Sequence, residues 1–249
     1  MAKTKETGHA KNVANFEDLI DVCKSYGTSY NPSREEIKIE SLSALLINAQ
    51  NAMEALKSAE RSFGNRTNDR ELAFDPLGPL TTRIVGALES SGANALTIED
   101  ARAILNKQRG NRSTPLPTPA PQENAEAASE PRTRSTSQRG FDNQEEHFKK
   151  LITAVSSEPK YKPNEPELTV QSLKAVLADL TVKNKLAGQA ETALNNARIL
   201  RDELLYGANT GIYDTVGVVK SYAVSAYGAT HKRYKQLTKF RFTKPSSEN

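Results

Sequence analysis

The side chains that could carry out chemistry in this chain are few, and the histidines come first. His9 lies in the N-terminal tail, His147 at the start of the second half and His231 close to the end. Glu145 and Glu146 stand beside His147, but they lack the i, i+4 spacing that would bring two ligands to one helical face. We interpret this cluster as the solvated start of a helix and assign no metal ion to it.

The single cysteine, Cys23, excludes a disulfide within the chain and any zinc site built on several cysteines. It continues an apolar stripe with Phe16, Leu19 and Ile20, where a cysteine behaves as a small hydrophobic residue. No Gly-x-Gly-x-x-Gly or Walker-type loop is present to bind phosphate. The sequence therefore predicts no catalytic residue, no cofactor and no metal site, and we expect a protein that is not an enzyme.

A sequence repeat gives the clearest information about organisation. Residues 16–20 match residues 148–152 at an offset of 132, and Tyr30-Asn-Pro matches Tyr161-Lys-Pro at an offset of 131. A shared register of this kind indicates that the two halves are copies of one fold. Four polar positions agree at the second offset: Ser41 with Ser172, Glu60 with Glu191, Asn65 with Asn196, and Arg70 with Arg201.

The shared polar positions allow two interpretations. Glu60, Asn65 and Arg70 are spaced by five residues, so they do not share a narrow face of one helix. The interpretation we favour is that they form hydrogen bonds or ion pairs between helices and fix the register of a bundle. Alternatively, both copies use these residues for a common ligand or partner surface. The repeated Tyr-x-Pro is expected to anchor a loop, with its ring packed on the bundle.

The C-terminal segment 231–244 concentrates the positive charge of a chain whose net charge is +4. Its basic and aromatic side chains could pair with phosphates and stack on bases. The candidate contacts are Lys232, Arg233, Tyr234, Lys235, Lys239 and Arg241. We favour a different interpretation, a short last helix whose Tyr234, Leu237 and Phe240 pack on the bundle while the charged groups face water. The rest of the chain is slightly acidic, which is unusual for a protein that works on nucleic acid.

The elements that must position these residues are helices. Leu42, Leu45, Leu46 and Ala49 follow the i, i+3, i+4, i+7 pattern, and a matching stripe begins at Leu173. Each stripe predicts a helix of about 30–35 residues. A shorter helix is expected before it, at residues 16–26 in the first half with Asn15 as N-cap. Two more helices are expected after it, and Gly92 and Gly228 stand where a C-terminal cap belongs.

Composition agrees with this fold class and divides the chain. Hydrophobic residues make up 37% of the sequence, aromatic residues 6%, and tryptophan is absent, so the cores must be mainly aliphatic. Residues 111–140 are rich in Pro, Ser and Thr and are expected to form a disordered linker. We predict an all-α protein of two similar antiparallel four-helix bundles. The expected parts are a flexible tail 1–14, a bundle 15–110, the linker 111–140, a bundle 141–243 and a tail 244–249.

The sequence is similar to a group of uncharacterised bacterial proteins built as a tandem helical repeat around a Pro-rich linker. The residues that carry this resemblance are Tyr161-Lys-Pro-Asn-Glu-Pro-Glu-Leu168, Asn195-Asn-Ala-Arg198, Tyr227-Gly-Ala-Thr230, Tyr234-Lys-Gln236 and Arg241-Phe-Thr243. The resemblance implies a bacterial origin and the duplicated architecture, and it brings no activity with it.

The expected function follows from the duplication. No signal-peptide core and no apolar run of about 18 residues is visible, so we expect a cytoplasmic protein that does not enter a membrane. Two like bundles on a tether are typical of an interaction or scaffold protein that binds a protein partner or itself. The alternative is a nucleic-acid-binding accessory protein that uses segment 231–244.

Overall fold

The computed structural model describes residues 5–110 and 140–245, with side chains from residue 8 onward. This part of the chain is helical and contains no β-strand, which confirms the all-α prediction for it. The expected linker lies outside the described residues except for Gly140, which precedes a helix. Within the two described ranges, no helix combines the length and the apolar composition that crossing a membrane requires.

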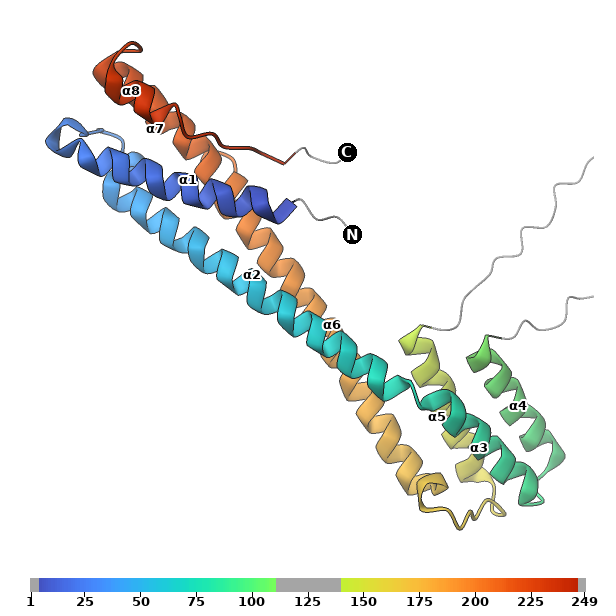
Figure 1. The fold of residues 1–249 in the computed structure, drawn as a ribbon. Helices are drawn as coiled ribbons and strands as arrows, with labels where there is room; N and C mark the ends of the chain where they lie inside the picture. The colour runs from blue at the N-terminus through green and yellow to red at the C-terminus, as the bar shows by residue number, and fades with distance from the viewer. Residues whose placement is uncertain (1–4, 111–139, 246–249) are drawn as a thin grey trace, which may run out of the picture. The chain divides into compact units, whose positions relative to one another are not determined.

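The helices follow the predicted order in both halves (Figure 1). The first half contains α1 (Lys5–Ser25), η1 (Gly27–Ser29), η2 (Glu35–Ile37), α2 (Ile39–Phe74), α3 (Leu77–Ser90) and α4 (Ala95–Arg109). The second half contains α5 (Phe141–Ser157), η3 (Pro166–Leu168), α6 (Val170–Tyr206), α7 (Ile212–Tyr227) and α8 (Lys232–Leu237). The long helices α2 and α6 are 36 and 37 residues long, slightly longer than expected.

The compact units of the structure do not follow the expected domain boundaries. Unit 1 comprises Met1–Gly64 and Ala190–Asn249, whereas unit 2 comprises Asn65–Gln189. The boundaries therefore fall inside α2 and α6, and each unit combines the beginning of one half with the end of the other. The prediction of two consecutive bundles, 15–110 and 141–243, is therefore replaced by two units that each contain parts of both halves. The physical reason lies in helix length, because α1, at 21 residues, cannot cover the apolar stripe of a 36-residue helix.

The core of unit 1 forms where α1 and the start of α2 pack with the end of α6 and with α7 and α8. Phe16, Leu19 and Cys23 on α1 are completely buried, as are Leu42 on α2 and Val219 on α7. Helix α1 contacts both α7 and α8. Aliphatic side chains make up most of this core, and the rings of Phe16, Tyr26 and Tyr30 are buried among them.

The core of unit 2 is built on α3, α4 and α5, which lie side by side (Figure 1). Phe148 and Leu151 on α5 pack with Leu88 on α3 and Ala101 on α4. Leu173, at the start of α6, is completely buried there and corresponds in the sequence offset to Leu42 of unit 1. Helix α4 has well-defined ends: Asn94 accepts from the backbone N–H of Leu96, and Gly110 has the positive φ of a C-terminal cap.

The start of α1 differs from the prediction. The helix begins at Lys5, so residues 5–14 are helical rather than a flexible tail, and Asn15 lies inside the helix instead of capping it. Asn12 and His9 occupy the apolar stripe one and two turns before Phe16, respectively, and both are buried. Because these two buried residues are polar, the apolar helical period of α1 cannot be followed in the sequence before Val13. Both predicted cap glycines have a positive φ: Gly228, directly after α7, at +86°, and Gly92, which follows the C-cap residue Ser91 of α3, at +71°.

Candidate functional site

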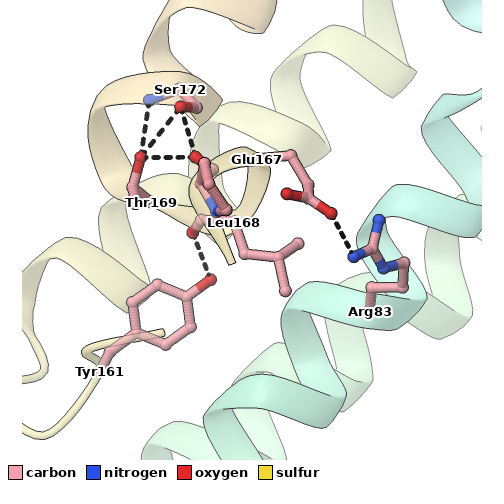
Figure 2. Close-up of polar contacts among 7 residues, drawn as sticks. Arg83, Tyr161, Glu167, Leu168, Thr169 and Ser172 are labelled. Carbon is pink, nitrogen blue, oxygen red and sulfur yellow. Dashed lines mark hydrogen bonds and ion pairs between the residues drawn. The ribbon is translucent and has the colours of Figure 1, made fainter. Parts of the chain in front are cut away.

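A buried tyrosine anchors the turn that leads into α6 in unit 2. Tyr161 donates a hydrogen bond from its hydroxyl to the main-chain carbonyl of Leu168 at 2.8 Å (Figure 2). The short helix η3 lies between these residues and brings the chain to the start of α6. Burial raises the pKa of Tyr161 to about 12, so its hydroxyl stays a donor at neutral pH.

The same bond occurs at the equivalent place in unit 1. Tyr30 donates to the carbonyl of Ile37 at 2.7 Å, and η2 takes the place of η3. Burial raises the pKa of Tyr30 as well. We call residues 30–38 and 161–169 the two Tyr-x-Pro turns. As predicted, the Tyr-x-Pro sequence anchors a loop with its ring packed in a core.

The long helices begin differently after these two turns. Thr169 caps α6 by accepting from the N–H of Ser172, and the Ser172 hydroxyl donates to the carbonyl of Pro166 at 2.6 Å (Figure 2). In unit 1, Lys38 replaces the threonine and forms an ion pair with Glu35 at 2.6 Å. Ser41 lies half-buried near the start of α2. The shared serines therefore stand at the first turns of the long helices, and Ser172 holds its turn together.

Each Tyr-x-Pro turn also presents an exposed glutamate that the sequence analysis did not single out. Glu36 and Glu167 agree at the same offset of 131 residues, which is the signal that would have revealed them. Glu36 pairs with Arg34 at 3.1 Å, and Glu167 pairs with Arg83 on α3 at 2.6 Å (Figure 2). These hydrogen bonds lower the pKa of both carboxyl groups, with Glu36 held mainly by its own backbone. Both side chains are therefore charged at neutral pH.

The shared arginines make different contacts in the two units. The guanidinium of Arg70 lies 4.1 Å above the ring of Phe141, and its Nη1 donates to Asn184 at 3.3 Å. Arg201 instead pairs with its neighbour Asp202 at 2.9 Å. Arg70 thus joins α2 to α5 and α6 within unit 2, as the favoured interpretation of helix-to-helix bonding expects, whereas Arg201 bonds along its own helix.

The remaining shared polar residues are spread over the surface of both units. Glu60 is half-buried, whereas Glu191, Asn65 and Asn196 are exposed. Ser41 and Glu60 belong to unit 1, and Asn65, Arg70 and Ser172 belong to unit 2. The shared positions of one half are therefore divided between two units and are not collected in one of them.

The basic C-terminal segment packs its rings and exposes most of its charges. Tyr234 and Phe240 contact the unit 1 core, and Leu237 is completely buried. Arg233 is the exception among the cations, because its guanidinium lies 5.2 Å from the ring of Tyr26 and 5.3 Å from that of Tyr227. The cations that stay exposed are Lys232, Lys235, Lys239, Arg241 and Lys244. The exposed cations could pair with the phosphates of a nucleic acid, but Tyr234 and Phe240 are packed against the core and are not free to stack on bases.

After α8 and the turn at Lys239, the chain continues over α1 without helical structure; we call residues 239–244 the C-terminal strap. Asn15 donates to the carbonyl of Arg241 at 2.7 Å. Asn12 donates to the carbonyl of Thr243 at 2.8 Å and accepts from its N–H at 3.2 Å. The strap is thereby fixed to α1 through its main chain.

The histidines and the cysteine occupy separate places. His9 and His147 are buried in different units, while the exposed His231 accepts from the N–H of Arg233 at the start of α8. Burial raises the pKa of Cys23 to about 12, which keeps the thiol protonated. In residues 5–110 and 140–245 no group of three or more His, Cys, Asp or Glu side chains is placed to hold a metal ion.

Comparison of the chain with family models, with curated proteins and with solved structures finds no match.

Proposed function

We propose that this chain is a non-enzymatic interaction protein that presents two like helical modules, one per unit, to a protein partner. The carrying observation is the repetition of the Tyr-x-Pro turn. The bonds Tyr30 to Ile37 and Tyr161 to Leu168 have nearly the same length and span the same number of residues. Each turn is followed by a long helix and carries an exposed glutamate at the same position. Two surfaces of this kind suit two copies of one partner.

The proposal includes an internal duplication in which the copies exchange their second parts. The ring pairs support it. Tyr206 pairs with His9 in unit 1, with centroids 5.5 Å apart, and Phe74 pairs with Phe141 in unit 2, at 5.0 Å. His9 corresponds to Phe141 and Phe74 to Tyr206 at the offset of 132. Each pair therefore joins the first helix of one half to the end of the long helix of the other half.

Photo-crosslinking at matched exposed positions tests the proposal. A photoreactive phenylalanine analogue is placed at Ser33 or at Asn164, which are exposed equivalents in the two turns. Illumination in a bacterial extract should join the same protein to both variants, and the purified pair should contain two partner copies per chain. An analogue at exposed Lys57 on α2 is the control and should give no adduct. Different proteins at the two turns, or a one-to-one complex, would contradict the proposal.

A second candidate, nucleic-acid binding by segment 231–244, is favoured by the row of exposed cations on it. Its contacts would be ionic, because Tyr234 and Phe240 are packed in the core. Replacing Lys232, Lys235 and Lys239 by Ala should then flatten the dependence of oligonucleotide affinity on salt concentration. Replacing exposed Lys57, Lys174 and Lys185 is the control and should leave the slope unchanged. A wild-type chain that binds no oligonucleotide at low salt would dispose of this candidate.

A further inference from the structure

We propose that the surface of unit 1 beneath the C-terminal strap is a binding site for an extended protein segment with aromatic side chains two residues apart. The strap, residues 239–244, is its resident occupant. This inference rests on the proposed interaction function and names the chemistry of one partner. It is independent of the two Tyr-x-Pro turns.

The hydrogen bonds that Asn12, Asn15 and Lys220 make to the strap go to its main chain. Asn15 binds the carbonyl of Arg241, and Asn12 binds both the carbonyl and the N–H of Thr243. From α7, Lys220 donates to the carbonyl of Phe240 at 2.8 Å. Main-chain bonds of this kind accept any extended segment, whatever its sequence. They provide affinity without selecting side chains.

Selection comes from alternate side chains. Phe240 and Phe242 are half-buried against the unit 1 core, and the Lys220 ammonium lies 5.6 Å from the centre of the Phe242 ring. Lys239, Arg241 and Thr243, which alternate with them, are exposed. In an extended segment every second side chain faces the same way, so the surface selects for an aromatic-x-aromatic pattern.

Hydrogen bonds outside the strap fix the position of the Asn12 side chain that binds it. Asn12 is only 2% exposed and donates to the hydroxyl of Tyr206 at 3.1 Å. His9 Nδ1 lies 2.7 Å from the same hydroxyl. These bonds hold the Asn12 amide in place whether or not a segment lies over it, so the site is already formed when an occupant leaves.

The strap competes with any partner because it is attached to the site. A tethered segment acts at an effective concentration in the millimolar range. A partner segment therefore binds well only when the strap is weakened.

The test uses the full chain with a weakened strap, Phe240→Ala with Phe242→Ala, and a labelled peptide of residues 239–244. Fluorescence anisotropy should show binding to this variant at least tenfold tighter than to the wild-type chain. The matched variant Lys239→Ala with Arg241→Ala keeps the strap rings and should behave as wild type. Adding Asn15→Ala to the weakened strap should abolish the gain. Equal binding to all variants, or none to a weakened variant with native circular dichroism, would overturn the inference.

Selection from a library of displayed hexapeptides distinguishes a site that recognises partner segments from one that binds only the strap sequence itself. Selection on the weakened variant should enrich aromatic-x-aromatic sequences with varied residues between the rings. Enrichment of the strap sequence alone, or exchange of straps between two copies seen as a dimer by light scattering, would overturn the inference. Crosslinking at Ser33 and Asn164 stays informative in either case, so a failure here leaves the proposed function standing.

Discussion

The Nδ1 atom of His9 lies 2.7 Å from the hydroxyl oxygen of Tyr206, although 197 residues separate them in the sequence. His9 belongs to the first helix of the chain, and Tyr206 is the last residue of α6. Asn12 adds a second bond to the same hydroxyl. Contacts of this kind make unit 1 a joint product of both halves of the chain.

Cutting the chain between its halves should therefore leave it assembled. A protease site inserted between Gly110 and Gly140 allows the purified protein to be cleaved. The two fragments should elute together, with the mass of the intact 27.3 kDa chain, when measured by size-exclusion chromatography with light scattering. Apolar cores hold them, so 1 M salt should not separate them. Fragments that elute apart as folded monomers would show that each half is a bundle by itself.

Removing the hydroxyl of a turn tyrosine should loosen one unit at a time. Tyr161→Phe leaves the buried carbonyl of Leu168 without its donor, which should lower the free energy of unfolding by about 1–2 kcal/mol. Tyr30→Phe is the matched change in unit 1. Hydrogen exchange should accelerate at the start of α6 in the first variant and at the start of α2 in the second. Changes confined to the same unit in both variants would contradict this prediction.

Truncating equivalent core residues should have large and local effects. Leu42 and Leu173 are both fully buried, so each change to Ala should lower the free energy of unfolding by about 2–5 kcal/mol. Hydrogen exchange measured during denaturant titration should show the loss of stability in unit 1 for Leu42→Ala and in unit 2 for Leu173→Ala. Leu96→Ala is the control, because this leucine is 70% exposed and its loss should change the unfolding free energy by less than about 0.5 kcal/mol.

His147 should make unit 2 less stable in mild acid. Burial lowers its pKa below the ordinary value of 6.5, Lys150 and Lys107 add to this, and Glu146 opposes it. The unfolded chain therefore binds the proton first, and the free energy of unfolding falls as the pH drops below about 6.5 and on through the lowered pKa. The contribution of one histidine is at most about 1.4 kcal/mol per pH unit.

The variant His147→Gln isolates this effect. Urea denaturation between pH 7.5 and 5 should show a smaller loss of stability in the variant than in the wild-type chain. Identical pH profiles for wild type and His147→Gln would refute the assignment.

The helices could be predicted from the sequence, but their partners could not. The stripes that contain Leu42 and Leu173 place α2 and α6 correctly, because an apolar period of 3.6 residues is a local property. Which helix covers a stripe is decided by contacts between distant residues, such as His9 with Tyr206. The helical period of a sequence carries no information about such distant contacts. The sequence therefore predicts that each half packs by itself as one of two consecutive bundles.

The candidate site was foreseen in part for a similar reason. The Tyr-x-Pro repeat correctly indicated an anchored loop, because Tyr30 and Tyr161 are identical in both halves. Glu36 and Glu167 were overlooked, although the same offset relates them. The strap left no sequence signal beyond Phe240 and Phe242, since Asn12 and Asn15 bind its main chain and main-chain atoms are the same in every sequence.

The division of unit 1 between the two ends of the chain sets the order in which the protein can fold during its synthesis. Residues 65–189 are continuous, so unit 2 can close as soon as they have left the ribosome. The apolar faces of α1 and α2 must wait for the residues from Ala190 onward. At 5–20 residues per second this delay lasts roughly 6–25 seconds. For that time the nascent chain lacks the residues that complete the core around Phe16 and Leu42.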